Sequence, residues 1–320
     1  MKPKTTIKKV YFNSDQQIEK LKKDGLTIPD EKHAKRRLKW EGYYNFAVGY
    51  NRLFKDKNKR YLHGVTFTHI EALFDFDKRL REIVYEATQQ VECNLKAILS
   101  DEFSARYGVD EREYLRVENF TAAPAEQANV RWIVGTCRAA LNDACREGTA
   151  CYRDYVDYYA RTYKHVPFWV LVRTLTFGNT SKFLRLLKPD DGRAVAREYG
   201  VPYPELCNLC ELVVCFRNIA AHGERVYSAR LPHVRLTKKL AVVPKLQLPK
   251  RQDGETLCGH SDCMALFIAL KYLLPDDSFK DYFGQLRAAV ERLERAFAYS
   301  RALQEMGLQG SWKKLDVMGK

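Results

Sequence analysis

The feature that most constrains the fold is a long stripe of apolar residues that recur every three or four positions. The stripe follows Thr68, and its members are Ile70, Leu73, Phe74, Leu80, Ile83, Val84, Ala87, Val91, Leu95 and Ile98. An α-helix turns once in about 3.6 residues, so this spacing places all of these side chains on one face. The sequence therefore predicts a single long helix, with one buried face, that ends near Gly108.

The same period marks most of the remaining chain. We expect helices over 129–147, Pro167 to Gly178, 181–188, 193–199, Pro204 to Gly223, 263–274 and Ser278 to Phe297. Between about 225 and 260, prolines and β-branched residues replace the helical pattern, which indicates an irregular or hairpin insertion. The prediction is an all-α fold, with a basic helical region over 1–66 and a helical bundle over 67–320 that contains this basic insertion.

Positive charge is concentrated in two segments of the 320-residue chain, whose formal net charge is +14. Residues 1–60 hold 17 lysines and arginines against 7 acidic residues, and residues 225–251 hold 8 basic residues and no acidic one. Such regional charge predicts a polyanion such as RNA as a partner, with a solvated basic surface as the alternative. The candidate RNA-binding residues, which include tyrosines able to stack on bases, are Lys35, Arg36, Arg37, Lys39, Tyr43, Tyr44, Arg225, Arg230, Arg235, Lys238 and Lys239.

Several classes of protein lose their support. No apolar run approaches the roughly 18 residues of a membrane span, and no export signal follows the basic start, so we expect a cytoplasmic protein without a membrane partner. The odd number of cysteines, nine, argues against a disulfide framework. A zinc site remains an alternative to buried thiols, and its ligands would be Cys207, Cys210, Cys258, His260 and Cys263. We expect no cofactor.

The most informative motif ends the helix that begins at Pro204. Arg217 and Asn218 are followed by His222, and then by Gly223. RNA cleavage without a metal needs a proton acceptor for the 2′-hydroxyl, a proton donor for the leaving 5′-oxygen and a cation for the crowded phosphate. An imidazole and a guanidinium supply these groups.

Helix geometry relates these side chains to one another. Asn218 and His222 are four residues apart and share a face, so the amide can orient the imidazole. Arg217 lies at the edge of the buried stripe, so its side chain must extend around the helix to approach His222, unless the helix unwinds near Gly223 or the site is shared by two chains. The alternative is structural: Arg217 in a surface ion pair and His222 as a helix cap.

Separated stretches of the chain, from about residue 15 to 300, resemble the Abi family of bacterial abortive-infection proteins, specifically its AbiD/AbiF-like group. The matching blocks are Trp40-Glu41-Gly42-Tyr43-Tyr44-Asn45 with Gly49-Tyr50, Phe74-Asp75-Phe76-Asp77-Lys78-Arg79-Leu80-Arg81, Pro167-Phe168-Trp169-Val170-Leu171-Val172, Leu175-Thr176-Phe177-Gly178-Asn179-Thr180-Ser181, the Arg217-Asn218-x3-His222 motif and Lys271-Tyr272-Leu273-Leu274. The chain departs from the family at Gly223, where many members have a second histidine.

The family's motif is similar to the Arg-x4–6-His signature of HEPN ribonucleases. This resemblance implies a HEPN-like helical bundle, catalytic Arg217 and His222 supported by Asn218, and a homodimer in which two motifs face each other. It also implies metal-independent cleavage to 2′,3′-cyclic phosphate and 5′-hydroxyl ends, and a small non-coding RNA as a partner. We therefore predict an anti-phage endoribonuclease. The alternatives are a non-catalytic protein of the same fold that binds structured RNA, and a DNA-binding regulator, for which no recognition helix is evident.

Overall fold

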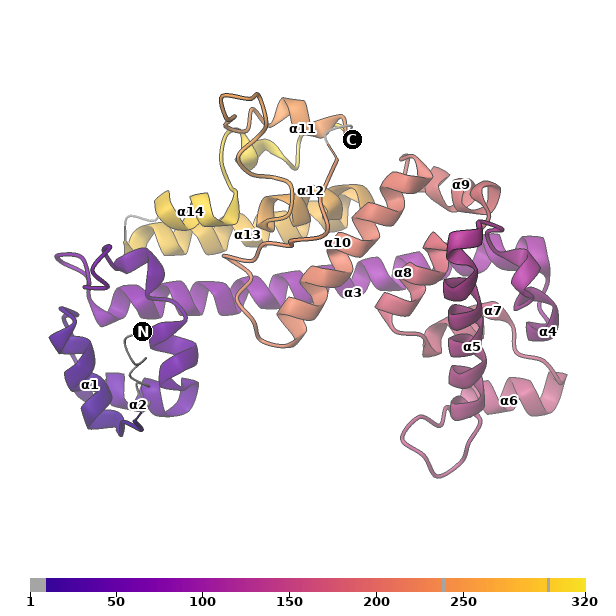
Figure 1. Cartoon of the computed structure of the whole chain (residues 1–320), viewed down its shortest axis with the longest axis horizontal. Coiled ribbons are helices and arrows are strands. Elements are labelled where there is room, and N and C mark those ends of the chain that lie inside the picture. Colours follow the sequence, from indigo (N-terminus) through magenta and orange to yellow (C-terminus); the bar gives the residue numbers. More distant parts are fainter. Residues whose placement is uncertain (1–9, 238–239, 298–299) are drawn as a thin grey trace, which may run out of the picture. The chain divides into compact units, whose positions relative to one another are not determined.

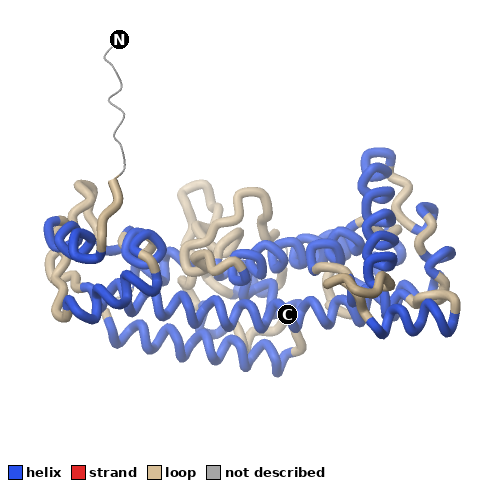
Figure 2. The backbone as a smooth tube through the Cα atoms, turned by 90° about the horizontal axis from the view of Figure 1, so that it is seen from below, coloured by secondary structure: helices blue, strands red, loops and turns tan. Residues whose placement is uncertain are grey.

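The computed structural model describes residues 10–237, 240–297 and 300–320. Helices and loops make up these residues, and Figure 2 shows no strand among them. The prediction of an all-α fold is confirmed. No helix in the described ranges combines the length and the apolar character that crossing a bilayer requires.

The chain forms two compact units, Met1–Leu80 with Ala288–Ala302, and Arg81–Arg287 with Leu303–Lys320. The first unit contains α1 (Ser14–Lys23) and α2 (Glu31–Glu41), followed by the short helices η1 (Tyr44–Val48) and η2 (Arg52–Phe54). Asn13 caps α1 through its side chain, and Asp30 does the same for α2.

Two of the sequence blocks that resemble the Abi family, those that contain Tyr50 and Asp77, are in contact inside the first unit. The Tyr50 hydroxyl donates a 2.6 Å hydrogen bond to Oδ2 of Asp77, and both side chains are buried. Phe46 and Phe74 pack beside them, with ring centroids 5.0 Å apart. Buried polar groups need such partners, so the tyrosine of one block holds the carboxylate of the other.

The predicted long helix is confirmed as α3 (Phe67–Tyr107), and Gly108 follows it with a φ of +76°. The second unit continues with α4 (Glu111–Tyr114), α5 (Gln127–Ala144), α6 (Asp154–Tyr163), α7 (Phe168–Leu171), α8 (Phe177–Arg185), α9 (Pro189–Arg197), α10 (Tyr203–Ala221), α11 (Val242–Lys245) and α12 (Cys263–Leu273). The chain then forms α13 (Asp276–Ala296) and α14 (Ser300–Met306). Within the second unit, α10 packs against α8, α9 and α12 (Figure 1).

The helix expected from Pro167 to Gly178 is wrong. After α7 and a 3-10 turn over Val172–Thr174, Leu175 is extended and a new helix, α8, begins at Phe177. The reason is the Thr176 side chain, which accepts a hydrogen bond from the Asn179 backbone N–H and caps the start of α8. Helix α6 was not predicted at all.

The segment after α10 is irregular, as predicted. It contains the short helix α11 and one antiparallel bridge, between Lys250 and Thr256, that closes a tight turn. The segment is nevertheless packed, because it buries a series of apolar side chains: Val226, Leu231, Val234, Leu236, Leu240, Val242, Leu246 and Leu248.

Candidate functional site

Helix α10 carries the motif at its solvent-exposed C-terminal end. Phe216 and Ala220 face the core, whereas Asn218 and His222 are exposed. Gly223 ends the helix with a φ of +70°, as the sequence predicts, and its N–H bonds to Ala220 O at 3.2 Å. The next N–H, of Glu224, reaches back to Ile219 O at 3.0 Å. These two bonds form a Schellman motif, which fixes His222 as the capping residue.

Arg217 lies at the edge of the buried stripe. Its guanidinium carbon is 5.9 Å from the ring centroid of Tyr85, on α3. One terminal nitrogen donates to the Asn218 side-chain oxygen at 3.4 Å, a long hydrogen bond. The Nε atom is buried and has no hydrogen-bond partner among the residues that the structure describes. The guanidinium is therefore held against an aromatic face with part of its donor capacity unused.

His222 has a different environment. Its backbone N–H donates to Asn218 O at 3.0 Å, but its exposed imidazole makes no hydrogen bond within the described ranges. The expected orientation of His222 by the Asn218 amide is not formed in this chain, because that amide is turned toward Arg217. An exposed imidazole is available to exchange a proton with a ligand. The contact of Arg217 with Tyr85 was missed by the sequence analysis, since nothing in the sequence links these positions.

A hollow of about 650 Å³ lies beside the same helix. Val214 and Cys215 line it from α10, and they precede Asn218 by four and three residues, so they share its face. On the other side, Lys182 of α8 lies with Nζ 4.3 Å from the ring centroid of Trp132 of α5, whose side chain is 47% exposed. The exposed face of α10 is thus flanked by a cation and an aromatic ring, the pair of groups that binds single-stranded nucleic acid.

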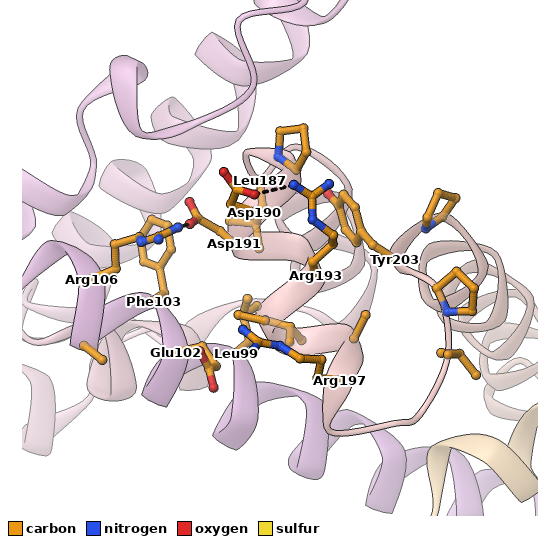
Figure 3. Close-up of a pocket in the computed structure, with 18 residues that line it drawn as sticks. Leu99, Glu102, Phe103, Arg106, Leu187, Asp190, Asp191, Arg193, Arg197 and Tyr203 are labelled. Atoms are coloured by element: carbon orange, nitrogen blue, oxygen red, sulfur yellow. Dashed lines mark hydrogen bonds and ion pairs between the residues drawn. The ribbon is translucent and has the colours of Figure 1, made fainter.

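A larger pocket, of about 1170 Å³, lies between α3 and α9 (Figure 3). Its charged side chains are partly paired with each other: Arg106 with Asp191, and Arg193 with Asp190. The ring of Tyr203 packs so closely on Gly192 that a Cβ at this position would clash with it. These contacts join α9 to α3 and to the start of α10. The charged and aromatic side chains of the pocket are therefore explained by the packing of these helices.

The N-terminal candidates for RNA binding have unequal surroundings. Arg37 forms ion pairs with Glu71 at 2.9 Å, Asp75 at 2.6 Å and Glu41 at 3.2 Å, and lies 5.4 Å from the ring centroid of Phe46. Its side chain is half-buried in the first unit. A cation with three carboxylate partners has little charge left for a phosphate.

The other residues of this group lie nearer to solvent. Lys35 is paired with Asp15 at 2.5 Å, and Tyr43 is half-buried, which raises the pKa of its hydroxyl. Arg36 and Lys39 are exposed, as is Tyr44 at 76%. Trp40, on the same turn of α2 as these cations, is 83% exposed and was not among the predicted contacts.

In the basic segment over residues 225–251, Arg225, Arg230 and Arg235 are all exposed. The predicted contacts Lys238 and Lys239 lie outside the described residues. Arg230 and Arg235 line one cavity, and Arg225 does not.

The cysteines that offered a zinc site are buried. Burial raises the pKa of the Cys207 thiol to about 11 and that of the Cys258 thiol to about 12, which disfavours the thiolate that binds zinc. In the part of the chain that the structure describes, no three His, Cys, Asp or Glu side chains come together as a group that could hold a metal ion.

Fold and motif together define an all-α protein with an Arg-Asn-x3-His sequence at the exposed end of a central helix. A model of the family described as Abi-like protein matches residues 36–228, more than half of the chain. The chain therefore belongs to the Abi-like family, and the resemblance to the Abi family is confirmed. The matched range contains α10 and its motif. Searches of the curated proteins and of the solved structures found no match.

Proposed function

We propose that this protein is a metal-independent HEPN-type endoribonuclease that acts in the bacterial cytoplasm in abortive infection, a defence against phage. The observation that carries the proposal is the placement of Arg217, Asn218 and His222 together at the exposed, capped end of α10. Membership of the Abi-like family supports the defence role. The regional positive charge supports RNA as the substrate, with a small non-coding RNA as a controlling partner.

In this mechanism each residue has one task. The His222 imidazole accepts the proton of the ribose 2′-hydroxyl, and the resulting oxygen attacks the adjacent phosphorus. The bond from phosphorus to the 5′-oxygen breaks, and that oxygen leaves with a proton from a second imidazole. Arg217 stabilises the charge of the five-coordinate phosphate, and Asn218 holds the guanidinium. The products carry a 2′,3′-cyclic phosphate and a 5′-hydroxyl.

The requirement for a second imidazole favours a homodimer. The motif has only one histidine, since Gly223 follows His222, so a single chain offers no partner for proton donation at the same helix end. The exposed position of His222 leaves it accessible to a second copy. Two copies related by a two-fold axis would bring two such helix ends together.

The alternative is a non-catalytic protein that binds structured RNA. The observation that favours it is the contact of Arg217 with Tyr85, which turns the guanidinium toward the protein and gives it a structural role. In that case the basic segments bind RNA, and the motif only ends the helix.

Cleavage of a labelled RNA by the full-length protein separates these functions. We expect His222→Ala to lower the rate by about 10² to 10⁴ fold and Arg217→Ala by about 10² to 10³ fold, with RNA affinity retained. His233→Ala and Arg131→Ala are matched controls, because both side chains are exposed and lie outside the motif. Cleavage should persist in a chelator. The 5′-hydroxyl end should accept a phosphate from polynucleotide kinase, and the 2′,3′-cyclic phosphate end should resist ligation until the phosphate is opened and removed.

Two results would count against the enzyme. If both motif variants cleave like the parent protein, the activity belongs to another site or to a contaminant. If no RNA is cut while binding weakens steeply with salt, the binding protein is the correct function. A composite site has its own test: a large excess of His222→Ala protein should suppress the parent protein by forming mixed dimers, whereas self-sufficient chains keep their full rate.

A further inference from the structure

A small polar cavity lies within the basic segment that follows the motif helix. Its volume is about 370 Å³, and three arginines line it: Arg230, Arg235 and Arg251. Thr256 and His260 also line it. Volumes of about 300 Å³ and above are typical of sites for small molecules, and this one is much too small for a nucleic-acid duplex.

Backbone hydrogen bonds bring the three arginines together from distant positions. Leu231 N–H donates to Ser261 O at 2.9 Å, and Leu236 N–H donates to His260 O at 2.7 Å. These bonds fix the stretch that carries Arg230 and Arg235 beside His260 and Ser261, which come just before α12. Arg251 N–H donates to Glu255 O at 2.7 Å, next to the bridge that closes the tight turn. The cavity is therefore built by tertiary contacts.

The side-chain charges of the cavity are unbalanced. Within the described ranges, none of the three arginines forms an ion pair with an acidic side chain. Two acidic residues, Asp262 and Glu255, also line the cavity. The Asp262 carboxylate is buried and already accepts hydrogen bonds from the backbone N–H groups of Gly259, at 2.9 and 3.1 Å, and of Ala265, at 3.0 Å. The cationic side chains therefore outnumber the acidic ones, and an anion would complete the site.

Another part of the cavity lining is held in place by hydrogen bonds. His260 Nε2 lies 2.7 Å from the Thr256 hydroxyl and 2.8 Å from the Thr256 carbonyl oxygen. A carbonyl oxygen only accepts, so Nε2 carries the hydrogen in that contact. These two contacts restrain the imidazole ring, so this part of the lining is held in place before a ligand binds.

We propose that this cavity binds a phosphomonoester, either the terminal phosphate of an RNA or the phosphate of a free nucleotide. A phosphomonoester carries a charge of about −1.5 to −2 at pH 7 and three terminal oxygens, so three guanidinium groups can each donate to it. A phosphodiester within an RNA chain has one charge and two free oxygens, and it matches the site less well. The proposal does not depend on the cleavage mechanism.

The test compares two single-stranded 2′-O-methyl oligoribonucleotides of one sequence, one with a 5′-phosphate and one with a 5′-hydroxyl, bound to the full-length protein. These probes cannot be cleaved through a 2′-hydroxyl, so a failure of the ribonuclease proposal does not affect the result. We expect the phosphorylated probe to bind about tenfold more tightly, because charge-assisted hydrogen bonds differ between the two. Arg235→Ala with Arg251→Ala should abolish the preference.

The control removes the same charge from the same segment. Lys245→Ala with Lys250→Ala replaces two exposed lysines that do not line the cavity, and it should keep the tenfold preference. Thermal melting of both double variants verifies that they fold. Equal affinity for the two probes, or a preference that survives loss of Arg235 and Arg251, would overturn the proposal.

Competition with adenosine 5′-monophosphate and with adenosine then distinguishes the two sources of the phosphate. If the monophosphate displaces the phosphorylated probe and adenosine does not, a free nucleotide is sufficient. If neither competes but the probe preference holds, the ligand is the end of an RNA chain. Both outcomes retain the phosphomonoester as the bound group.

Discussion

Replacing Gly223 by alanine tests the way in which the motif helix ends. Gly223 has a φ of +70°, in the left-handed region, where a Cβ atom costs about 1–2 kcal/mol. A Cβ at this position meets no atom within 4 Å, so no steric clash adds to that cost. Alanine also restricts the unfolded chain, which returns about 0.4–1 kcal/mol. We expect Gly223→Ala to lower the free energy of unfolding by about 1 kcal/mol.

The same chemical change inside a helix provides the control. Gly135 lies within α5, and a Cβ there also meets no atom within 4 Å. Because alanine is the better helix former, Gly135→Ala should raise the free energy of unfolding by about 1 kcal/mol. Urea unfolding followed by circular dichroism measures both. If Gly223→Ala also stabilises the protein, the helix continues past His222, and the exposed capping position assigned to this histidine is incorrect.

Two further predictions concern buried polar groups. Tyr50→Phe removes the hydroxyl that donates to Asp77 and should lower the free energy of unfolding by about 2 kcal/mol in urea titrations, whereas Tyr44→Phe, at an exposed position, should change it little. Burial lowers the pKa of the Lys271 ammonium group, so the unfolded chain binds the proton of this group more tightly than the folded chain does. The free energy of unfolding therefore rises with pH between the folded-state pKa and about 10.5, the pKa of an ordinary lysine. Lys271→Met should therefore stabilise the protein by about 1 kcal/mol at pH 7, and its advantage should shrink toward pH 10; an advantage independent of pH would contradict this.

Periodicity predicted the helices whose apolar stripe is continuous and missed the points where one helix replaces another. The stripe from Ile70 to Ile98 lies in one helix, α3, so its pattern was sufficient. From Pro167 to Gly178, apolar residues continue on both sides of the short polar stretch Arg173-Thr174, and the capping role of Thr176 marks the start of α8. A cap depends on the geometry of three or four residues, which hydrophobic spacing does not report.

In the candidate site, too, the sequence predicted some features and missed others. Positions along one helix are fixed by covalent spacing, so the shared face of Asn218 and His222 could be derived from the sequence. Contacts between segments that are distant in the chain could not be derived from the sequence. Arg37 was counted as a free cation because its partners Glu71 and Asp75 lie more than thirty residues away in the chain. Counting charges does not distinguish a cation paired inside the protein from one that faces solvent.

Tyr85 is the contact that decides between the two functions proposed for Arg217. If the guanidinium stabilises the transition state, the aromatic face 5.9 Å from its central carbon holds it in place, and Tyr85 is a positioning residue. Tyr85→Phe keeps the ring and should retain the cleavage rate. Tyr85→Ala removes it and should lower kcat about tenfold with KM unchanged, which corresponds to the energy of one cation–π contact. A purely structural contact predicts another result: Tyr85→Ala lowers the melting temperature, but kcat of the folded protein stays at the level of Tyr85→Phe.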